Sequence, residues 1–377
     1  MTSLQDLATP CALVDVARMQ RNIARMQARM DALGVRFRPH VKTSKCVDVA
    51  RRQRDAGARG ITVSTLKEAE EFFAAGFDDI LYAVGIAPNK FAQARALRER
   101  GCDLKLITDN AAAATALGRF GAAHGHRFEA WIEIDCDGHR SGIAPEGAAL
   151  LEVARAIVEG GSALGGVLTH AGSSYELDTE AALQAMAEQE RAGCVRAAQR
   201  LRDEGFPCPN VSVGSTPTAL SAQSLQGVTE VRAGVYVFQD LVMANVGICS
   251  PADIALGVLT TVIGHQAEKG WTIVDAGWMA MSRDRGTQRQ RHDYGYGQVC
   301  TATGDVIDGC LMTGANQEHG IVSCTGGAGS SVAERFPVGT QLLVRPNHAC
   351  ATGAQFPEYV AVQPDGTLAR WPRFAGW

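Results

Sequence analysis

The sequence lacks the features that mark several large classes of protein. Its 36 Lys and Arg residues are balanced by 40 Asp and Glu, and no basic block stands out, so the chain lacks the positive field that nucleic-acid binding requires. No apolar run approaches the roughly 18 residues that a membrane-spanning helix needs. With 46% hydrophobic and 20% charged residues, the chain is not of the disordered type either. We therefore expect a folded protein whose partners are neither nucleic acids nor membranes.

Nucleotide-binding and metalloprotease motifs are missing as well. The chain contains no GxGxxG fingerprint, no GxxxxGK[ST] phosphate loop and no HExxH helix. The run GGAGSS at residues 326–331 lacks the final glycine and the strand and helix context of a fingerprint, so we interpret it as a glycine-rich turn. The chemistry must therefore come from other residues.

The sequence also has no recognisable export signal. Its first ten residues, MTSLQDLATP, lack a charged head followed by an apolar segment. The eleven cysteines are scattered and odd in number, which favours reduced thiols over a disulfide scaffold. We expect a cytoplasmic protein in which most cysteines are small packing residues.

Helical periodicity and short apolar runs alternate from about residue 14 to about residue 245, in the order typical of repeated strand–helix units. Residues 14–33 carry apolar side chains at spacings of mostly three to four, and Gly34 follows where a helix is expected to stop. Further amphipathic stretches are long enough for crossovers in a parallel sheet, at residues 66–75, 89–100, 109–123, 144–159 and 178–204. The apolar runs between them predict eight strands, at residues 35–41, 60–65, 79–84, 103–108, 128–134, 164–170, 210–214 and 229–238.

Eight such units over about 230 residues match a closed (β/α)8 barrel of the TIM type in number and length. After about residue 250 the helical periodicity fades, and short apolar runs separated by Gly, Asn and Asp turns predict a β-rich domain. We therefore expect an α/β barrel at residues 12–248 and a C-terminal β domain at residues 249–377, to which residues 1–11 can be added.

Polar residues at the carboxyl ends of the strands are the first candidates for chemistry, because TIM-type barrels place their reactive groups there. Lys42 lies where the first predicted strand passes into a loop. A surface lysine with its ammonium group in water is one interpretation. The other is a Schiff-base lysine, whose amine needs neighbouring positive charge or burial to act as a nucleophile. Arg38, His40 and Lys45 lie close in sequence and carry such charge.

The chain resembles the fold-type III pyridoxal-phosphate enzymes, in the branch of the D-threonine aldolases and D-serine dehydratases. Two motifs carry the resemblance in this order, PHVKT at residues 39–43 and PNHAC at residues 346–350, and it extends from Thr9 to Val362. The resemblance implies an alanine-racemase-like barrel, pyridoxal 5′-phosphate as cofactor, and Lys42 as the lysine that binds it covalently. It also implies a homodimer.

Residues after the fifth and sixth strands take roles from the same resemblance. In similar enzymes the arginine of the D-x-G-x-R-x-G run, here Arg140, lies beside the phenolic oxygen of the cofactor and keeps it ionised. An arginine paired with Asp135 or Asp137 is the alternative. His170 and Tyr175 are expected to line the cofactor ring and the substrate, with a packed core histidine as the alternative for His170.

A phosphate site is expected after the seventh strand. Gly214, Ser215 and Thr216 can direct backbone amides and hydroxyls at an anion, and barrels often bind phosphate at this position, although such turns are also common in ordinary loops. Gly234 and Tyr236, near the end of the eighth strand, are similar to family positions that complete this site.

His348 and Cys350 form the candidate metal site. Residues two apart on an extended strand project from one face, so the imidazole and a thiolate can hold one divalent ion, with water or substrate completing its shell. A buried packing pair is the alternative. The resemblance implies that this H-x-C pair binds a catalytic metal beside the cofactor. We expect Zn, Co or Mn, and a thiolate ligand favours the first two.

The resemblance implies a lyase that acts on D-3-hydroxy amino acids. In a dehydratase Lys42 removes the α proton, and an ion on His348 and Cys350 stabilises the departing hydroxyl, so that a 2-oxo acid and ammonia result. Because dehydratases of this branch carry H-x-C where aldolases carry H-x-D, we prefer dehydration. An aldolase, which leaves glycine and an aldehyde, and a noncatalytic cofactor carrier are the alternatives.

The expected small-molecule substrates are D-threo-3-hydroxyaspartate, D-serine and D-threonine. Arg283 and Arg285, in the loop at residues 282–286, can clamp the second carboxylate of a 3-hydroxyaspartate. A solvated charged loop is the alternative. The partner of the pyridine nitrogen has no signal in the sequence.

Overall fold

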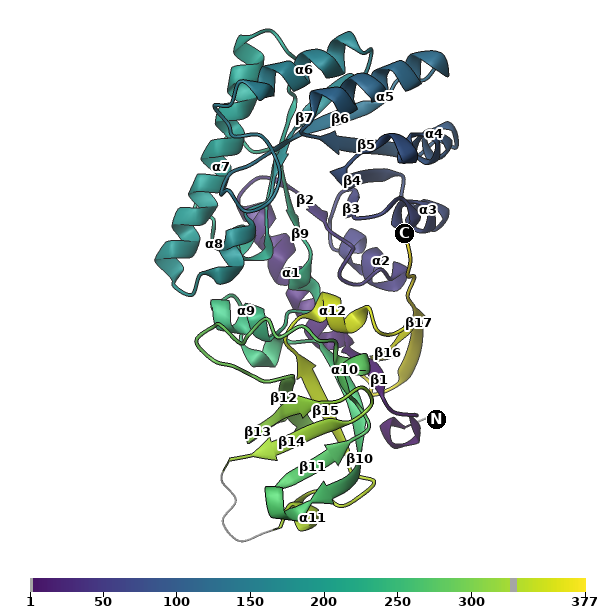
Figure 1. The fold of residues 1–377 in the computed structure, drawn as a ribbon, viewed down its shortest axis with the longest axis vertical. Helices are drawn as coiled ribbons and strands as arrows, with labels where there is room; N and C mark the ends of the chain where they lie inside the picture. Colours follow the sequence, from purple (N-terminus) through teal and green to yellow (C-terminus); the bar gives the residue numbers. More distant parts are fainter. Residues whose placement is uncertain (1–2, 326–330) are drawn as a thin grey trace. The chain divides into compact units, whose positions relative to one another are not determined.

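The computed structural model describes residues 3–325 and 331–377, and the chain divides into two compact units (Figure 1). The barrel unit comprises Ala24–Gly234 and Gly376–Trp377, and the β unit comprises Met1–Ile23 and Val235–Ala375. None of the described helices combines the length and the apolar character needed to cross a membrane. The glycine-rich turn expected at residues 326–331 lies outside the described residues, except for its last residue.

Eight parallel strands form the sheet of the barrel unit. They hydrogen-bond in the order β2-β9-β8-β7-β6-β5-β4-β3, and a parallel bridge between His40 and Thr62 joins the two end strands. Each strand expected from the sequence is present, so the α/β barrel prediction is confirmed. The strands are β2 (Arg36–Pro39), β3 (Ile61–Val63), β4 (Asp79–Gly85), β5 (Asp103–Thr108), β6 (Glu129–Ile134), β7 (Ala163–Thr169), β8 (Asn210–Val213) and β9 (Glu230–Ala233).

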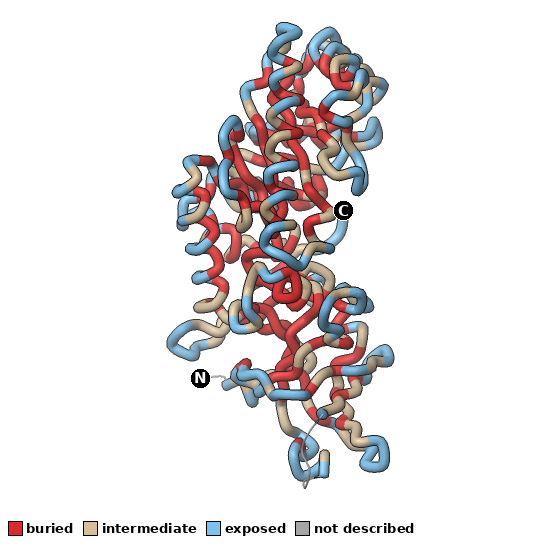
Figure 2. Tube along the Cα trace, turned by 90° about the vertical axis from the view of Figure 1, so that its left-hand side faces the viewer, coloured by how far each residue is buried: buried red, intermediate tan, exposed pale blue. Residues whose placement is uncertain are grey.

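Helices connect these strands and lie on the outside of the sheet (Figure 1). Local signals start four of them, because Thr65, Asn110, Thr179 and Ser215 are N-cap residues whose side chains accept hydrogen bonds from backbone amides three residues on. Figure 2 shows buried strands in the middle and helices that expose one side. The helices are α1 (Val16–Ala32), which begins in the β unit, α2 (Val47–Asp55), α3 (Leu66–Ala74), α4 (Phe91–Glu99), α5 (Ala111–Ala123), α6 (Ala149–Glu159), α7 (Glu180–Asp203) and α8 (Thr216–Ser221), with 3-10 turns η2 (Pro88–Lys90) and η3 (Gly172–Glu176).

The interior of the barrel is filled by charged and apolar layers. Near the amino ends of the strands, Arg38 Nε lies 3.1 Å from Glu230 and its Nη1 2.7 Å from Asp79, while Lys105 Nζ lies 2.5 Å from Asp79 and 2.6 Å from Asp103. The Arg38–Glu230 pair is buried, and removing one partner of such a pair leaves an uncompensated charge and typically costs about 3–5 kcal/mol. An apolar cluster packs further along the strands, formed by Leu81, Ile107, Trp131 and Leu168. This filling leaves the carboxyl ends of the strands for chemistry.

The β unit is built on a nine-stranded sheet, which confirms the β-rich prediction. Its strand order is β11-β14-β13-β12-β15-β10-β1-β16-β17, and a further pairing between β10 and β11 closes part of the sheet on itself. The strand nearest the N-terminus, β1, pairs with β10 and β16 and so belongs to this unit. The strands are β1 (Cys11–Asp15), β10 (Leu256–Gln266), β11 (Trp271–Val274), β12 (Gly297–Thr301), β13 (Val306–Ala315), β14 (Gly320–Cys324), β15 (Gln341–Pro346), β16 (Glu358–Val362) and β17 (Leu368–Pro372).

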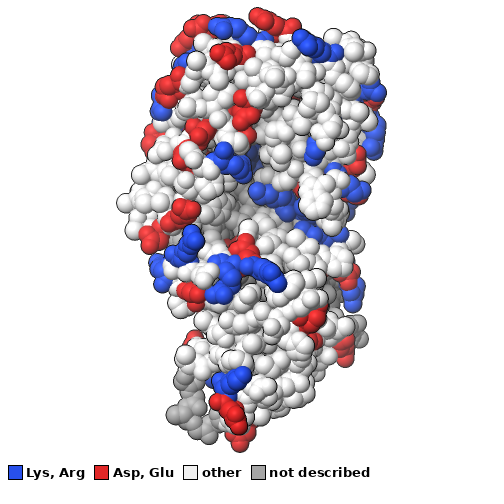
Figure 3. All heavy atoms as spheres, viewed as in Figure 1, with Lys and Arg blue, Asp and Glu red and all other residues white. Residues whose placement is uncertain are grey.

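Short helices connect and flank these strands. A core rich in valine and methionine lies inside the closed part of the sheet, with Val258, Val299, Met312 and Val344 fully buried. On the face shown in Figure 3, acidic side chains lie among basic ones in both units. The helical segments are η1 (Leu4–Asp6), η4 (Val235–Val237), α9 (Leu241–Val246), η5 (Pro251–Asp253), η6 (Ala267–Lys269), α10 (Trp278–Met281), α11 (Val332–Arg335) and α12 (Ala349–Gly353).

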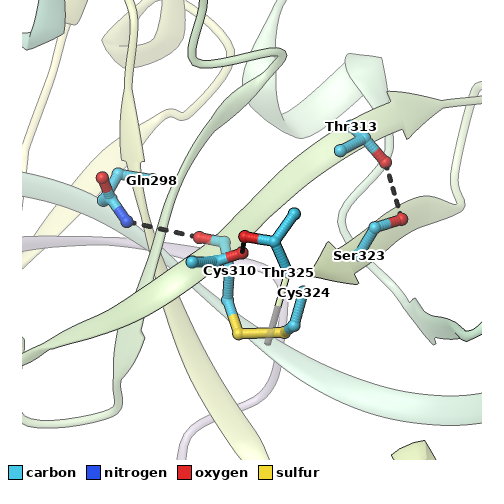
Figure 4. Close-up of a disulfide and its surroundings, with 7 residues drawn as sticks. Gln298, Cys310, Thr313, Ser323, Cys324 and Thr325 are labelled. Carbon is cyan, nitrogen blue, oxygen red and sulfur yellow. Dashed lines mark hydrogen bonds between the residues drawn. A yellow bond between two sulfur atoms is a disulfide. The ribbon is translucent and has the colours of Figure 1, made fainter. Parts of the chain in front are cut away.

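A disulfide joins Cys310 and Cys324, so the expectation that all thiols are reduced is wrong for this pair (Figure 4). The two residues lie directly opposite each other on the antiparallel strands β13 and β14, with Cα atoms 4.0 Å apart. Sequence spacing alone does not reveal this register, because a shift of one residue would turn one sulfur to the other face. The other nine cysteines form no disulfide.

Candidate active site

Lys42 follows β2 at the carboxyl end of the barrel strands, and its side chain is half-buried. The expectation that Arg38 and Lys45 provide positive charge beside it is wrong. Arg38 belongs to the ion-pair network inside the barrel, and Lys45 Nζ lies 3.1 Å from Glu68. Both charges are therefore matched by carboxylates.

Two histidines of the barrel unit are held in the neutral form. Burial, reinforced by the positive charges of Lys42 and Arg232, lowers the pKa of His40 well below its usual value and lowers the pKa of His170 to about 4. Nδ1 of His170 lies 3.0 Å from the carbonyl oxygen of Gly214. A carbonyl oxygen only accepts, so Nδ1 carries the proton and Nε2 remains an acceptor.

His40 and Tyr175 add further polar groups near His170. Nδ1 of His40 is buried and has no hydrogen-bond partner among the described residues. An unsatisfied buried nitrogen costs about 1–3 kcal/mol, which a bound ligand or water removes. Tyr175 lies in η3, half-buried, with its ring centroid 6.1 Å from that of His170. The structure therefore brings together His170 and Tyr175, as expected from the sequence.

Two glycines allow backbone segments of the barrel to approach closely. Gly214 has a φ of +134°, and a Cβ atom there would overlap the carbonyl oxygen of Arg232. A Cβ atom on Gly234 would lie 3.1 Å from both the carbonyl oxygen of His40 and Oγ1 of Thr43. The loops after β2, β8 and β9 therefore approach closely at these positions, where a Cβ would overlap the backbone at Gly214 and crowd its neighbours at Gly234.

Ser215 is the N-cap residue of α8. Its hydroxyl bonds with the hydroxyls of Ser174 and Thr218, and its amide donates to Thr218 Oγ1. Thr216 follows as the first residue of the helix and is buried. Within the predicted phosphate loop, Ser215 therefore fixes the shape of the turn.

Glu190 of α7 holds two of the loops in place, a role that sequence reasoning missed. The carboxylate accepts hydrogen bonds from the amides of Ala171 and Gly214, at 2.9 and 3.0 Å, and burial raises its pKa. These amides adjoin His170 and begin the predicted phosphate loop. An acid inside a long amphipathic helix looks like a solvated residue until the tertiary contacts are known.

Arg232 of β9 is a second residue that sequence reasoning missed. It is 5% exposed, it donates to Ser212 Oγ at 2.6 Å and to the carbonyl oxygen of Thr169 at 2.5 Å, and burial lowers its pKa. The position of this arginine inside the apolar run of the eighth strand was the sequence signal that indicated a buried charge. Its charge acts on both His40 and His170.

Arg140 lies in the loop after β6 and is exposed. Its Nη2 lies 3.5 Å from Glu133, and not against Asp135 or Asp137, which accept hydrogen bonds from backbone amides of nearby loops. The charge of Arg140 also lowers the pKa of His170. Arg140 is therefore electrostatically coupled to the group around Lys42.

His348 and Cys350 lie at the start of α12 in the β unit. The expectation of an extended strand is wrong here, because β15 ends at Pro346, His348 is the N-cap residue and Cys350 belongs to the first helical turn. The amide of Ala349 donates to Asp240 Oδ2 at 2.9 Å, which anchors this turn. The two side chains are nevertheless brought together, with a hydrogen bond between them.

Acidic groups surround His348. Its Nδ1 lies 2.6 Å from Asp284 Oδ2. Burial alone would lower the pKa of His348, but the negative charge of Cys350 and the bond to Asp284 outweigh it and raise this pKa to about 11. Burial raises the pKa of Asp240, which also faces His348. An environment that favours a proton on this imidazole favours a metal cation for the same electrostatic reason.

Tyr236 lies in η4, fully buried, and the structure assigns it to the β unit, whereas Gly234 ends the barrel unit. Arg283 and Arg285 flank Asp284 in the loop after α10. Asp284 was not predicted as a site residue, because the two arginines on either side of it are the stronger charge signal in the sequence. The orienting role of its carboxylate depends on a contact 64 residues away in sequence.

The residues of the barrel unit fit pyridoxal phosphate. They offer a lysine amine, a neutral imidazole with one acceptor nitrogen, the unpartnered Nδ1 of His40, and loops whose glycines leave room where a Cβ would collide. The β unit fits a divalent metal ion, because an imidazole and a sulfur lie together among carboxylates. In the described part of the chain, no group of three or more His, Cys, Asp and Glu side chains is arranged to hold a metal. The pair alone would therefore offer two ligands, and water or substrate would have to complete the shell.

Comparisons with known proteins match both parts of the chain. Residues 14–241 match the family of the alanine racemase N-terminal domain, and residues 255–362 match a serine dehydratase domain. The chain is 66% identical over 377 residues to the D-threo-3-hydroxyaspartate dehydratase of Delftia sp. (strain HT23), covering 100% of this chain and 99% of that protein. It is 28% identical to a D-threonine aldolase of Arthrobacter sp., over 91% of this chain and 86% of the aldolase.

Solved structures of the Delftia dehydratase also match this chain over its whole length. The structure of the Delftia dehydratase matches with a TM-score of 0.99 at 65% identity, covering all of both chains. Structures of a histidine-to-alanine variant and of a cysteine-to-alanine variant of that enzyme also match over the whole of this chain, with TM-scores of 0.98, and the cysteine variant is in the metal-free form. The two substituted positions are two residues apart, as are His348 and Cys350.

Proposed function

This chain belongs to the family of alanine racemase N-terminal domain proteins that carry a serine dehydratase domain, and we propose that it is a dehydratase of D-3-hydroxy amino acids. D-Threo-3-hydroxyaspartate is its main substrate, with D-serine and D-threonine as further ones. The reaction removes water and then ammonia and leaves a 2-oxo acid.

The observation that carries this proposal is the His348 and Cys350 pair. It lies among carboxylates in a chain 66% identical to a D-threo-3-hydroxyaspartate dehydratase, whose cysteine-to-alanine variant is metal-free. A sulfur ligand is softer than a carboxylate and favours zinc or cobalt over manganese. We assign the ion to this pair, with zinc or cobalt as the preferred metal.

Two bonds of the substrate must break, Cα–H and Cβ–O, and different residues are assigned to each. In the barrel unit Lys42 is the residue that binds pyridoxal phosphate and whose Nζ takes the proton from Cα. The bound cofactor supplies an electron sink for the charge left at Cα. Gly214, Ser215, Thr216, Gly234 and Tyr236 are assigned to its phosphate, and Arg140 to its phenolic oxygen.

His170 is a positioning group in this scheme. Its Nδ1 is tied to Gly214, and its neutral Nε2 can accept a hydrogen bond from the cofactor or the substrate, together with Tyr175 on the same side. In the β unit His348 and Cys350 would hold a metal ion, which would supply a Lewis acid for the departing hydroxyl. Asp284 fixes the orientation of the His348 ring.

One incubation separates the proposed activity from that of an aldolase. With D-threonine, a dehydratase forms 2-oxobutanoate and ammonia, whereas an aldolase forms glycine and acetaldehyde. We expect the first pair of products, and a chelator that removes the ion should stop their formation without removing the cofactor. Glycine as the main product would overturn the proposal, and tight cofactor binding with no turnover of any of the three substrates would indicate a carrier.

Two finer assignments belong to the proposal, and the first of them rests on resemblance to the family. We propose a homodimer, which light scattering of the purified holoenzyme tests directly. We also propose a cytoplasmic location. Fractionation of the cells of origin, with the reaction products as the readout, would test it.

A further inference from the structure

The chemistry of 3-hydroxyaspartate restricts where its second carboxylate can be recognised. This carboxylate is attached to Cβ, the same carbon that carries the departing hydroxyl. D-Serine carries only hydrogen at that position. Under the proposed function, on which this inference rests, the hydroxyl binds the ion on His348 and Cys350. A group that distinguishes the two substrates must therefore lie within a side chain's length of this pair, and the β unit offers a candidate in the loop beside it.

The segment that follows α10 is fixed against this pair by three contacts. Asp284 Oδ2 lies 2.6 Å from His348 Nδ1, the side-chain amide of Asn347 donates to the carbonyl oxygen of Asp284 at 3.2 Å, and Thr352 Oγ1 donates to the carbonyl oxygen of Met281 at 2.8 Å. The helices α10 and α12 lie side by side as a result (Figure 1). Arg283 lies between the anchored residues 281 and 284.

The two arginines of this loop differ in what they already bind. Arg285 Nη2 lies 3.0 Å from Asp293 Oδ2 and 3.2 Å from its Oδ1, and the guanidinium lies 5.0 Å from the ring centroid of Tyr296. Arg283 makes no ion pair or hydrogen bond with any described residue, and it is exposed. Its one defined contact is with Trp278, whose ring centroid lies 4.0 Å from the guanidinium carbon. Arg285 therefore stabilises the loop, while the donors of Arg283 are available.

Trp278 gives Arg283 a rigid support. Its amide donates to the carbonyl oxygen of Asn316 at 2.9 Å, and a Cβ on Gly277 would overlap the backbone of residues 316 and 317, so α10 begins in close contact with the turn between β13 and β14. The cation–π contact with the indole ring restrains the guanidinium on one side and leaves its other donors for an anion.

The backbone before Arg283 is also unusual. Ser282 has φ 69° and ψ 166°, a backbone conformation that residues other than glycine rarely adopt. Its hydroxyl accepts a hydrogen bond from the amide of Asp284 at 3.1 Å. This conformation ends α10 abruptly and directs the next residues towards α12. Such strain persists only where surrounding contacts enforce it.

We propose that Arg283 binds the second carboxylate of the substrate and makes this protein selective for 3-hydroxyaspartate over D-serine. A guanidinium and a carboxylate form a bidentate pair that a neutral residue does not replace. Asp284, the next residue, orients the metal ligand His348, so one short segment serves both the hydroxyl and the carboxylate attached to the same carbon.

The test compares kcat/KM for D-threo-3-hydroxyaspartate and for D-serine in matched variants. We expect Arg283→Gln to lower the value for hydroxyaspartate by about 10- to 100-fold, the scale of hydrogen bonds to a charged group, and to change the value for D-serine by less than about threefold. Arg283→Lys keeps the positive charge but loses the planar geometry of the guanidinium. Its kcat/KM for hydroxyaspartate should lie between the values of the wild type and Arg283→Gln. Arg289→Gln, an exposed arginine of the same loop, is the control and should change neither value.

A binding measurement supplements the kinetics. D-Malate has a hydroxyl and a carboxylate on one carbon but no amino group, and 3-hydroxypropanoate keeps the hydroxyl and the other carboxylate but lacks the carboxylate on that carbon, so Ki values against D-serine turnover report anion recognition without reaction. D-Malate should lose its advantage over 3-hydroxypropanoate in Arg283→Gln. Equal losses for both substrates, or an unchanged ratio of the two Ki values, would overturn the assignment of Arg283. Absence of turnover of either substrate by the wild type would instead overturn the proposed function.

Discussion

Oδ2 of Asp284 lies 2.6 Å from Nδ1 of His348. A carboxylate that accepts the Nδ1 proton leaves Nε2 as the nitrogen available to a metal ion, and it makes that nitrogen a stronger ligand. We predict that Asp284→Ala weakens metal affinity by about 10- to 100-fold, the range found for such outer partners. Competition with a fluorescent chelator measures this affinity. Asp305→Asn, an exposed acid of the same unit, is the control, and an unchanged affinity in Asp284→Ala would mean that the contact does not orient a ligand.

The metal ligands should be separable from the cofactor. We expect His348→Ala and Cys350→Ala to be purified with little divalent metal but with the full visible absorbance of bound pyridoxal phosphate, because these residues belong to the β unit and Lys42 to the barrel unit. Dehydratase activity should fall by at least about 10²-fold, since the ion contributes several kcal/mol to the departing oxygen. Metal content and visible absorbance, measured on the same samples, test whether the metal is lost while the cofactor stays bound. Full activity in either variant without metal would exclude a catalytic role for the ion.

Lys42 should carry the covalent link to the cofactor. We predict that Lys42→Ala lacks the visible absorbance of a lysine-bound pyridoxal after incubation with the cofactor, and that turnover falls by about 10²- to 10⁴-fold or more, the scale of a lost general base. Lys45→Gln is the matched control, three residues on, because its ammonium is paired with Glu68. Borohydride reduction followed by mass spectrometry of the modified peptide identifies the lysine. Modification at any other lysine would contradict the assignment.

The sequence predicted the elements of the fold better than the contacts of the site. The eight barrel strands are apolar runs bounded by local signals, and short-range patterns suffice to find them. His348 and Cys350 were selected by their motif. The strand expected for them is a helical turn, because the short motif does not show that β15 ends at Pro346. Glu190, Arg232 and Asp284 were missed because their partners lie far away in sequence. The disulfide was not predicted either, because only the register of β13 and β14 places Cys310 opposite Cys324.

Glu190 should determine how firmly the loops after β7 and β8 are held. Glu190→Ala leaves two buried backbone amides without an acceptor, each costing about 1–3 kcal/mol, so we expect a lower thermal unfolding temperature and weaker cofactor binding. Glu190→Gln keeps one oxygen for both amides and should restore most of the cofactor affinity. Equilibrium dialysis with pyridoxal phosphate measures this. Equal affinities in the alanine variant and the wild type would show that the carboxylate is not a positioning group.

The neutral histidines should make the stability of the cofactor-free protein depend on pH. The folded state holds the pKa of His170 at about 4, against 6.5 for the ordinary side chain, so between these values the unfolded chain binds a proton that the folded chain does not. This contribution to the free energy of unfolding is therefore complete above pH 6.5 and is lost as the pH falls toward 4, by at most about 3 kcal/mol. Urea titrations of the wild type and of His170→Gln at pH 7.0 and 5.0 measure it, and the variant should lose less stability over this interval. His124→Gln, at an exposed position, should follow the wild type, and parallel pH dependence in His170→Gln and the wild type would mean that His170 titrates normally in the fold.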